Sequence, residues 1–231
     1  MARINKGALT RNEIVTEATK QFLDKGYCNT TVAAIAKSLE MSQGNLTFHY
    51  PTKEHLLAEL TDMLCHFQWK KMESVADEGI SSILALCLEL TTMAAACEAD
   101  PVIKEFLVAS YTSPMCLAII RKNDAERARE VFGAYCASWT EESFAEAEML
   151  VSGIEFATLM TAGTEVSLER RITVALDTIL MIYRIPQQIR REKLKKVFAL
   201  DYRSIGLDTI TEFKQFVEES NEQVFSQLLH R

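Results

Sequence analysis

The stretch SQGNLTFHYPTKEHLL (residues 42–57) gathers hydrogen-bonding side chains into a segment that otherwise has a helical pattern. Gln43 and Asn45 each offer a paired donor and acceptor, for which the edge of an adenine base is the natural partner. Gly44 lies between them, and its missing side chain lets the backbone approach another molecule closely. Thr47 can form a hydrogen bond or touch a thymine methyl group. These side chains indicate a short helix that presses its leading end against DNA.

Two helices are expected before this segment. Thr10 and Glu13 match a capping box that would open the first helix, and Gly26 would end it. Thr31 is a suitable N-cap for the second helix, which carries an apolar stripe of its own.

A tight connection at Glu40 then leads to Ser42, which can cap a third helix that Pro51 ends. Two short helices joined by such a turn have the shape of a helix-turn-helix, whose second helix lies in the DNA major groove. His49 and Lys53 lie where that helix ends and can reach phosphates.

The segment TTVAAIAKSLEMSQGNLTFHYPTKEHLL (residues 30–57) resembles the tetracycline-repressor (TetR) family of bacterial regulators. The resemblance implies that Thr31 and Lys53 contact phosphates and that residues 43–45 and Thr47 face the groove. The residues we expect at the DNA interface are Thr31, Ser42, Gln43, Gly44, Asn45, Thr47, Phe48, His49 and Lys53. For Phe48 and His49, packing within the protein is the alternative role.

The segment departs from the family pattern at two positions. Glu40 stands where the family usually has a turn glycine, so the turn either holds a strained residue or is of another kind. Its carboxylate also stands near the expected phosphates. Thr47 occupies a position where a phosphate-touching tyrosine is common, which leaves its contact open.

The rest of the chain predicts an all-α protein with two domains. Residues 1–60 are expected to form a three-helix DNA-binding domain, and residues 61–231 a larger helical domain that binds an effector and dimerises. No linker is expected, because a fourth helix that begins at Thr52 carries leucines into the second half. Further helices are expected at about 80–99, 101–111, 114–137, 141–163, 167–184, from Pro186, and within 207–229.

Composition narrows the classes of function. The net charge is −7; residues 1–60 carry seven basic and six acidic side chains, or +1, so the remainder carries −8. No apolar run of membrane-spanning length is present, and we expect a cytoplasmic protein without a membrane partner. The six cysteines lack metal-site spacing and are expected to be reduced thiols. No catalytic motif, metal or cofactor is expected.

These observations favour a homodimeric transcriptional regulator. By the family resemblance, it would bind a palindromic double-stranded DNA operator and leave it when a small-molecule effector binds. An apolar effector is expected at aromatic and sulfur-containing side chains: Met63, Phe67, Met93, Phe106, Tyr111, Tyr135, Trp139, Phe156 and Met160. The alternative is a helical ligand-binding or interaction protein that no longer binds DNA. An enzyme is a third and weaker reading.

Two expectations concern assembly and coupling. Apolar stripes on 141–163 and 167–184 would close a four-helix bundle between two subunits. The fourth helix would link the effector site to the DNA-binding helices, with Phe67 in the coupling path. The stripes comprise Phe144, Ala147, Val151, Ile154, Ile172, Ala175, Ile179 and Ile182.

Overall fold

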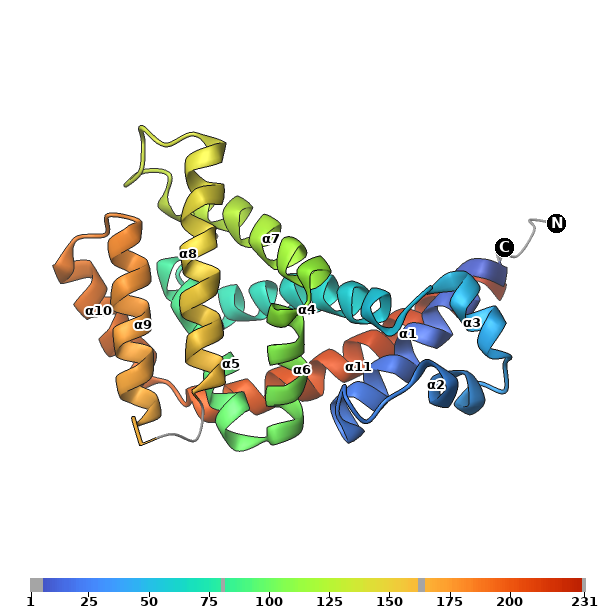
Figure 1. The fold of residues 1–231 in the computed structure, drawn as a ribbon. Coiled ribbons are helices and arrows are strands. Elements are labelled where there is room, and N and C mark those ends of the chain that lie inside the picture. The colour runs from blue at the N-terminus through green and yellow to red at the C-terminus, as the bar shows by residue number, and fades with distance from the viewer. Residues whose placement is uncertain (1–5, 80–81, 162–164, 230–231) are drawn as a thin grey trace.

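The computed structural model describes residues 6–79, 82–161 and 165–229. Within these ranges the chain forms eleven helices and no strand, so the all-α prediction is confirmed (Figure 1). The helices are α1 (Lys6–Lys25), α2 (Val32–Ser38), α3 (Gln43–His49), α4 (Lys53–Ala76), α5 (Ile83–Ala99), α6 (Pro101–Thr112), α7 (Pro114–Phe132), α8 (Glu141–Met160), α9 (Leu168–Ile182), α10 (Gln187–Ala199) and α11 (Tyr202–Leu229).

Helices α1 to α3 form a small head at one end of the molecule (Figure 1). The hydroxyl of Thr31 accepts a hydrogen bond from the backbone N–H of Ala34, and Ser42 does the same for Asn45, so both predicted caps are confirmed. Leu46 is fully buried, as is the ring of Tyr50 directly after α3. These two side chains fix the side of α3 that faces the head, and the opposite side is left open.

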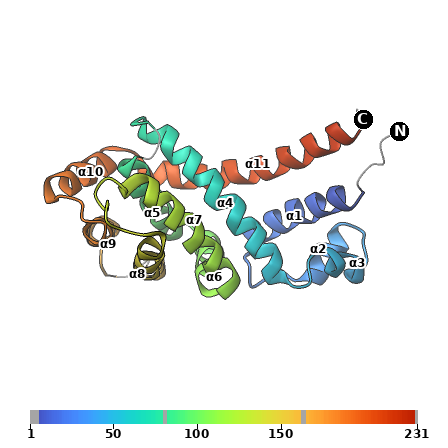
Figure 2. The same cartoon turned by 90° about the horizontal axis from the view of Figure 1, so that it is seen from above.

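Helix α4 starts in the head and continues through the body without a break (Figure 2). Its first half buries Leu56, Leu57 and Leu60, and its second half buries Leu64 and Met72 against the body helices. The expected absence of a linker is therefore confirmed, because one helix contributes to the core of both parts.

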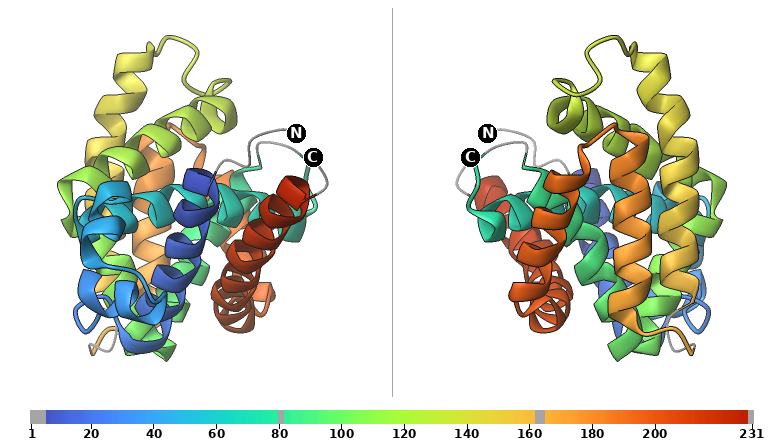
Figure 3. Two further views of the ribbon diagram at one scale, coloured as in Figure 1. Left: turned by 90° about the vertical axis from the view of Figure 1, so that its right-hand side faces the viewer. Right: turned by 90° about the vertical axis from the view of Figure 1, so that its left-hand side faces the viewer.

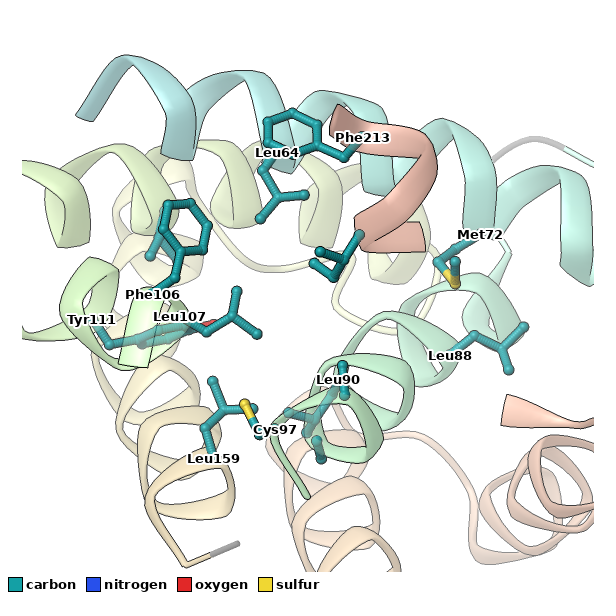
Figure 4. Close-up of a cluster of buried hydrophobic side chains, with 14 of the residues drawn as sticks. Leu64, Met72, Leu88, Leu90, Cys97, Phe106, Leu107, Tyr111, Leu159 and Phe213 are labelled. Atoms are coloured by element: carbon teal, nitrogen blue, oxygen red, sulfur yellow. The ribbon is translucent and has the colours of Figure 1, made fainter. Parts of the chain in front are cut away.

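The body is built around α5, which is buried over most of its circumference, as its nearly continuous apolar sequence predicts. Figure 4 shows side chains from α4, α5, α6, α8 and α11 meeting in one buried cluster that includes Leu64, Leu90, Phe106, Leu159 and Phe213. This continuous core gives the body a rigid frame.

Helices α6 and α7 both begin with a proline after a capping side chain, Asp100 and Ser113, as predicted. No single helix in the described ranges is long and apolar enough to span a membrane. Among the described helices, α6 and α7 taken together pass that test by length and composition, and they are bent by 86° at their junction.

Helix α11 runs back from the far end of the body and lies beside α1 (Figures 1 and 2). Gly206 lets it cross α5 closely, because a Cβ atom there would lie 2.5 Å from the carbonyl oxygen of Thr92. The Lys214 ammonium pairs with Asp24 of α1, and Lys71 of α4 pairs with Glu212 of α11 at 2.6 Å. The last helix thus fastens the head to the body.

Three predicted boundaries were wrong. Helix α1 already begins at Lys6, so Thr10 and Glu13 lie inside it and do not form a terminal capping box. Helix α7 ends at Phe132, five residues earlier than predicted, since 133–135 form turns. The last helix starts at Tyr202, because it continues along α5 and α1 over a length that the local pattern does not define.

The turn between α2 and α3 has a left-handed residue, Glu40, with φ of 52°. The N–H of Glu40 donates to the carbonyl of Lys37 at 3.2 Å, and that of Met41 to the carbonyl of Ala36 at 3.0 Å. This pair of bonds is a Schellman motif, which normally has glycine in the left-handed position. The turn therefore has the geometry typical of a glycine turn although a glutamate occupies it.

We expect Glu40→Gly to stabilise the protein by about 1 kcal/mol, because glycine adopts positive φ without the steric cost that a Cβ atom adds. Urea unfolding followed by circular dichroism would measure the change. Glu40→Ala is the control, since it removes the same carboxylate but keeps the strained Cβ atom. An equal gain in both variants would assign the effect to the charge instead of the backbone.

Candidate DNA interface and interior cavity

The exposed side of α3 carries the residues that were predicted from the sequence to contact DNA bases. Gln43, Gly44 and Asn45 are exposed, and nothing lies within 4 Å of the position that a Cβ atom of Gly44 would take. The Thr47 hydroxyl donates to the carbonyl of Gly44 at 3.2 Å and is partly exposed. The leading turn of α3 thus presents two amide side chains around a bare stretch of backbone.

Phe48 extends this face, because its side chain is 83% exposed and does not pack on α4. Its ring meets the ring of His49 edge to face, with centroids 5.3 Å apart. His49 is half-buried at the end of α3 and lines an open hollow together with Tyr50, Glu59 and other residues of α4 and α7. For Phe48, the packing alternative is therefore excluded.

Lys53 has contacts inside the head that the sequence did not indicate. Its ammonium donates to the carbonyl of Tyr27 at 2.8 Å and to that of Thr30 at 3.0 Å, and it lies 4.0 Å from the centroid of the Tyr27 ring. Burial is the main reason that the pKa of Tyr27 rises to about 12. Lys53 thus holds the connection between α1 and α2, beside the α2 N-cap Thr31. Its contact with phosphate remains a prediction.

An ion-pair network holds the end of α3 in place. Arg11 of α1 donates to the Glu59 carboxylate at 2.6 Å, and the Tyr50 hydroxyl donates to the same oxygen at 2.9 Å. The guanidinium carbon of Arg11 lies 4.5 Å from the centroid of the Tyr50 ring. Helices α1, α3 and α4 therefore share one polar junction, which fixes the direction in which α3 projects.

The body contains a small, largely enclosed cavity of about 50 Å³ between α4, α5, α6, α7, α8 and the end of α9. The lining residues are Thr61, Leu64, Cys65, Gln68, Leu86, Glu89, Met93, Leu107, Ser110, Tyr111, Ile120, Asp124, Arg127, Glu148, Val151, Glu155, Ile179 and Tyr183. A space of this size can hold a few water molecules in the closed form.

Arg127 is the cation that lines this cavity. One guanidinium nitrogen donates to Glu89 at 2.9 Å and to Asp124 at 3.4 Å, and the other donates to the backbone carbonyl of Cys65. Burial raises the pKa of both acids, whereas the charge of Arg127 opposes that rise. Arg127, Glu89 and Asp124 therefore form one closed group that joins α4, α5 and α7.

Two further acids face the cavity from α8 and meet tyrosines instead of cations. Glu155 accepts a hydrogen bond from the Tyr111 hydroxyl at 3.0 Å, and one oxygen of Glu148 accepts from the Tyr183 hydroxyl. Burial raises the pKa of Glu148 to about 7, and burial together with the nearby Asp124 raises that of Glu155 well above its ordinary value. The cavity wall thus holds carboxyl groups that are costly to ionise.

Of the nine residues proposed for an effector site, Met93 and Tyr111 line this cavity. Phe106 is fully buried in the core, and Phe67 packs on α11, with its ring centroid 5.7 Å from that of Phe213 and 5.2 Å from that of Phe216. The remaining five also lie outside the cavity lining: Met63 lines the open hollow beside α3, Trp139 packs on Phe144 and Tyr183, Phe156 is half-buried on α8, and Tyr135 and Met160 are exposed.

Sequence reasoning missed the polar part of the cavity. Glu148, Val151 and Glu155 are spaced three and four residues apart, which places two acids on an apolar helix face. Asp124 and Arg127 are three residues apart on α7. Charges within an apolar stripe were the available signal, whereas the residues expected at an effector site were all aromatic or sulfur-containing. In the described ranges, no group of His, Cys, Asp or Glu is arranged to hold a metal ion.

Comparison with known proteins places residues 14–60 in the family described as bacterial regulatory proteins, tetR family. The chain is 38% identical over 64 residues to the HTH-type transcriptional regulator QacR of Staphylococcus aureus (strain Mu50 / ATCC 700699), which is 26% of this chain and 34% of that protein. It is 30% identical over 80 residues to the uncharacterized HTH-type transcriptional regulator YuxN of Bacillus subtilis (strain 168), which is 35% of this chain and 28% of that protein. The chain therefore matches about a third of the length of these curated relatives.

Solved structures extend the likeness beyond the head. RolR in complex with resorcinol has a TM-score of 0.66 at 16% identity, over 83% of this chain and 96% of that chain. Thermus thermophilus FadR, a TetR family transcriptional repressor in complex with lauroyl-CoA, has a TM-score of 0.55 at 17% identity, over 74% and 93%. These similarities show a shared fold. Residues 14–60 thus match the tetR family of bacterial regulatory proteins, and the chain as a whole shares its fold with these two solved structures.

Proposed function

We propose that this protein is a DNA-binding transcriptional regulator, a repressor that a small molecule releases from a palindromic operator. The observation that carries the proposal is the continuity of α4, which follows the exposed helix α3 at one end and lines the interior cavity at the other. We assign residues 1–60 to DNA binding and residues 61–231 to effector binding and dimerisation, in a protein that acts in the cytoplasm.

In the DNA-bound form, α3 lies in the major groove with its first turn toward the base edges. Gln43 and Asn45 contact bases, while Thr31, Ser42, Thr47, Phe48, His49 and Lys53 surround them at the phosphates and at the edge of the groove. The exposure of Gln43, Gly44 and Asn45, together with the buried anchor Leu46, supports this orientation. A gel shift with the DNA upstream of the protein's own gene tests the function directly.

We expect Gln43→Ala or Asn45→Ala to weaken binding to the operator by about 1–3 kcal/mol and to change binding to random DNA little, because an amide reads a base edge and not the backbone. Titration of both DNAs at one salt concentration would measure this difference. Lys37→Ala, on the exposed side of α2, serves as a comparison for loss of charge alone. Equal losses on operator and random DNA would remove the base-reading role.

A dimer would place two such heads on the two half-sites of a palindrome. The stripes expected to form its interface were assigned wrongly, because Phe144, Ala147, Val151, Ile172 and Ile179 are buried within the subunit. Helices α8 and α9 instead lie side by side (Figure 3, right). Each of them also has exposed apolar residues. This set of residues, the α8–α9 face, comprises Met149, Leu150, Met160, Val174 and Met181.

We propose that the α8–α9 face closes the dimer, because Leu150 and Val174 are 63% and 61% exposed and exposed apolar patches mark interaction sites. Light scattering at micromolar concentration should then show a dimer for the wild type and a monomer for Leu150→Lys combined with Val174→Lys. Met115→Lys changes an exposed methionine on α7 and should leave the dimer intact. A dimeric double variant would move the interface elsewhere.

The effector signal would pass from the cavity to α4 where α6 meets it. The hydroxyl oxygens of Thr61 and Ser110 lie 3.1 Å apart, and both residues line the cavity. Nearer to the head, the Ser113 hydroxyl donates to Glu54 of α4 at 2.5 Å, and Glu105 of α6 accepts a hydrogen bond from the backbone N–H of Cys28. A ligand that moves α6 would therefore tilt both α4 and the head. Two recognition helices must stand about 34–36 Å apart, so a small tilt prevents binding.

We expect Thr61→Val to reduce the effect of ligand on operator affinity while changing operator affinity without ligand less than tenfold, because the substitution keeps shape but removes the polar link between α4 and α6. Phe67→Ala is the comparison, since Phe67 lies on the α11 side of the same helix. Operator titrations with and without ligand give the ratio of affinities. If the ratio of operator affinities with and without ligand is unchanged in Thr61→Val but changed in Phe67→Ala, the coupling runs through Phe67 and not through Thr61.

A further inference from the structure

The charges of the cavity wall do not balance. Among the described lining residues there are four carboxyl groups, on Glu89, Asp124, Glu148 and Glu155, and a single guanidinium, on Arg127. Arg127 is already occupied by Glu89, Asp124 and a backbone carbonyl. The two acids of α8 are thus left with tyrosine hydroxyls as their only protein hydrogen-bond donors in the described ranges.

Glu148 also has an unused acceptor. Its side chain is 2% exposed, and its Oε2 atom is buried without a hydrogen-bond partner among the described residues. A buried polar atom of this kind costs about 1–3 kcal/mol, so proteins rarely leave one in place without a reason. Because Glu148 lines the cavity, a molecule inside it can satisfy this oxygen.

We propose that the cavity, which must widen from its closed volume of about 50 Å³, binds an organic cation, a flat amidinium or aromatic ammonium that donates an N–H to Glu148 Oε2 and places its charge between Glu148 and Glu155. The proposal deepens the function above, since this cation would be the effector. Its apolar part would lie against Leu107, Val151 and Ile179, and the rings of Tyr111 and Tyr183 would add cation–π attraction. The sequence predicts an effector with apolar character, and the cavity wall adds that this effector carries a positive charge.

Other ligand classes fit the same wall less well. An anion would meet four carboxyl groups, and the one guanidinium of the described lining already pairs with two of them, Glu89 and Asp124. A neutral molecule could bond to Glu148, but it would gain no charge attraction when the acids of the cavity wall ionise. A metal ion lacks a ligand set, because the described His, Cys, Asp and Glu side chains form no group that could hold one. The hydrophobic part of the lining also favours an organic ligand.

The ionisation of Glu148 gives the cation a pH signature. The charged and titratable groups that act on Glu148 are Tyr183 at the end of α9, Glu89 of α5, Arg121, Asp124 and Arg127 of α7, and Glu155 of α8. With the pKa of the empty site raised to about 7, a proton occupies Glu148 below that pH. A cation must displace this proton, so its affinity should increase from pH 6 to pH 8, by up to about tenfold per pH unit.

The test uses three probes of nearly equal shape and different charge: benzamidinium, benzamide and benzoate. Titration calorimetry on the full-length protein should show benzamidinium binding with a Kd in the millimolar range or tighter, as is usual for a fragment of this size. Benzamide and benzoate should bind at least about tenfold more weakly. Stronger binding of benzamide or benzoate, or no binding of benzamidinium at about 10 mM, would overturn the proposal.

Glu148→Gln is the decisive variant, because it keeps the shape and the bond to Tyr183 but removes the charge. It should weaken benzamidinium at least about tenfold and abolish the increase of affinity with pH. Its melting temperature at pH 8 should equal or exceed that of the wild type, because a buried unpaired charge is gone; this shows that the variant folds. Glu146→Gln makes the same change at an exposed position of α8 and should bind as the wild type does.

Glu155→Gln should also weaken the cation, and normal benzamidinium binding in both cavity variants would refute the site. The gel shift separates this inference from the function on which it rests. If the protein binds the operator but not benzamidinium, the proposed regulatory function stands and the proposed cation site is wrong. If the protein binds benzamidinium but not the operator, the proposed cation site stands and the proposed regulatory function is wrong.

Discussion

The continuous helix α4 is the constraint on which the other features of the molecule depend. Its first turns bury leucines in the head, and its later turns bury Leu64 and Met72 in the body, so neither part can shift without moving the helix. Two polar contacts join the body to this end of the molecule: Ser113, the N-cap of α7, donates to Glu54 of α4 itself, and Glu105 of α6 accepts from the backbone N–H of Cys28. The proposed regulator would need two distinct sites linked by an element that both sites influence, and a continuous helix is suited to that role.

A second constraint is the cost of burying charge. The body places carboxyl groups of three helices around one small cavity, and burial raises the pKa of each of them. Arg127 offsets part of this cost by binding Glu89 and Asp124. The α8 pair is left with tyrosine hydroxyls, and so this side of the cavity is where a ligand gains most by bringing its own positive charge.

Helix α8 belongs both to the wall of the cavity and to the α8–α9 face proposed for the dimer. One of its faces lines the cavity with Glu148, Val151 and Glu155, and another exposes Met149 and Leu150 on the α8–α9 face. A ligand that moves α8 would therefore act on the packing of two subunits as well as on α4. Helix α11 limits the response, because it fastens α1 to the body through the pairing of Lys214 and Asp24.

Local signals in the sequence were sufficient for most helices and for the exposed side of α3. The caps at Thr31, Ser42, Asp100 and Ser113 were predicted correctly because a cap depends on residues within one turn of each other. The resemblance of residues 30–57 to the TetR family was visible for the same reason, since it lies in one unbroken stretch, and the family model matches residues 14–60. The true start of α1 and the course of α11 were missed, because they depend on partners far along the chain.

The sequence by itself determined that this chain is helical, that Gln43, Gly44 and Asn45 share the leading turn of a helix, and that α4 continues from head to body. Only the tertiary structure decided which faces of α8 and α9 are internal. It shows that the apolar stripes expected at the dimer interface are mostly buried in the core of the subunit. It also brought Glu89, Asp124, Arg127, Glu148 and Glu155 together from three helices around one cavity. The periodicity of a helical sequence shows that one face of the helix is apolar or charged. It does not show which other helix packs against that face, because this depends on segments distant in the chain.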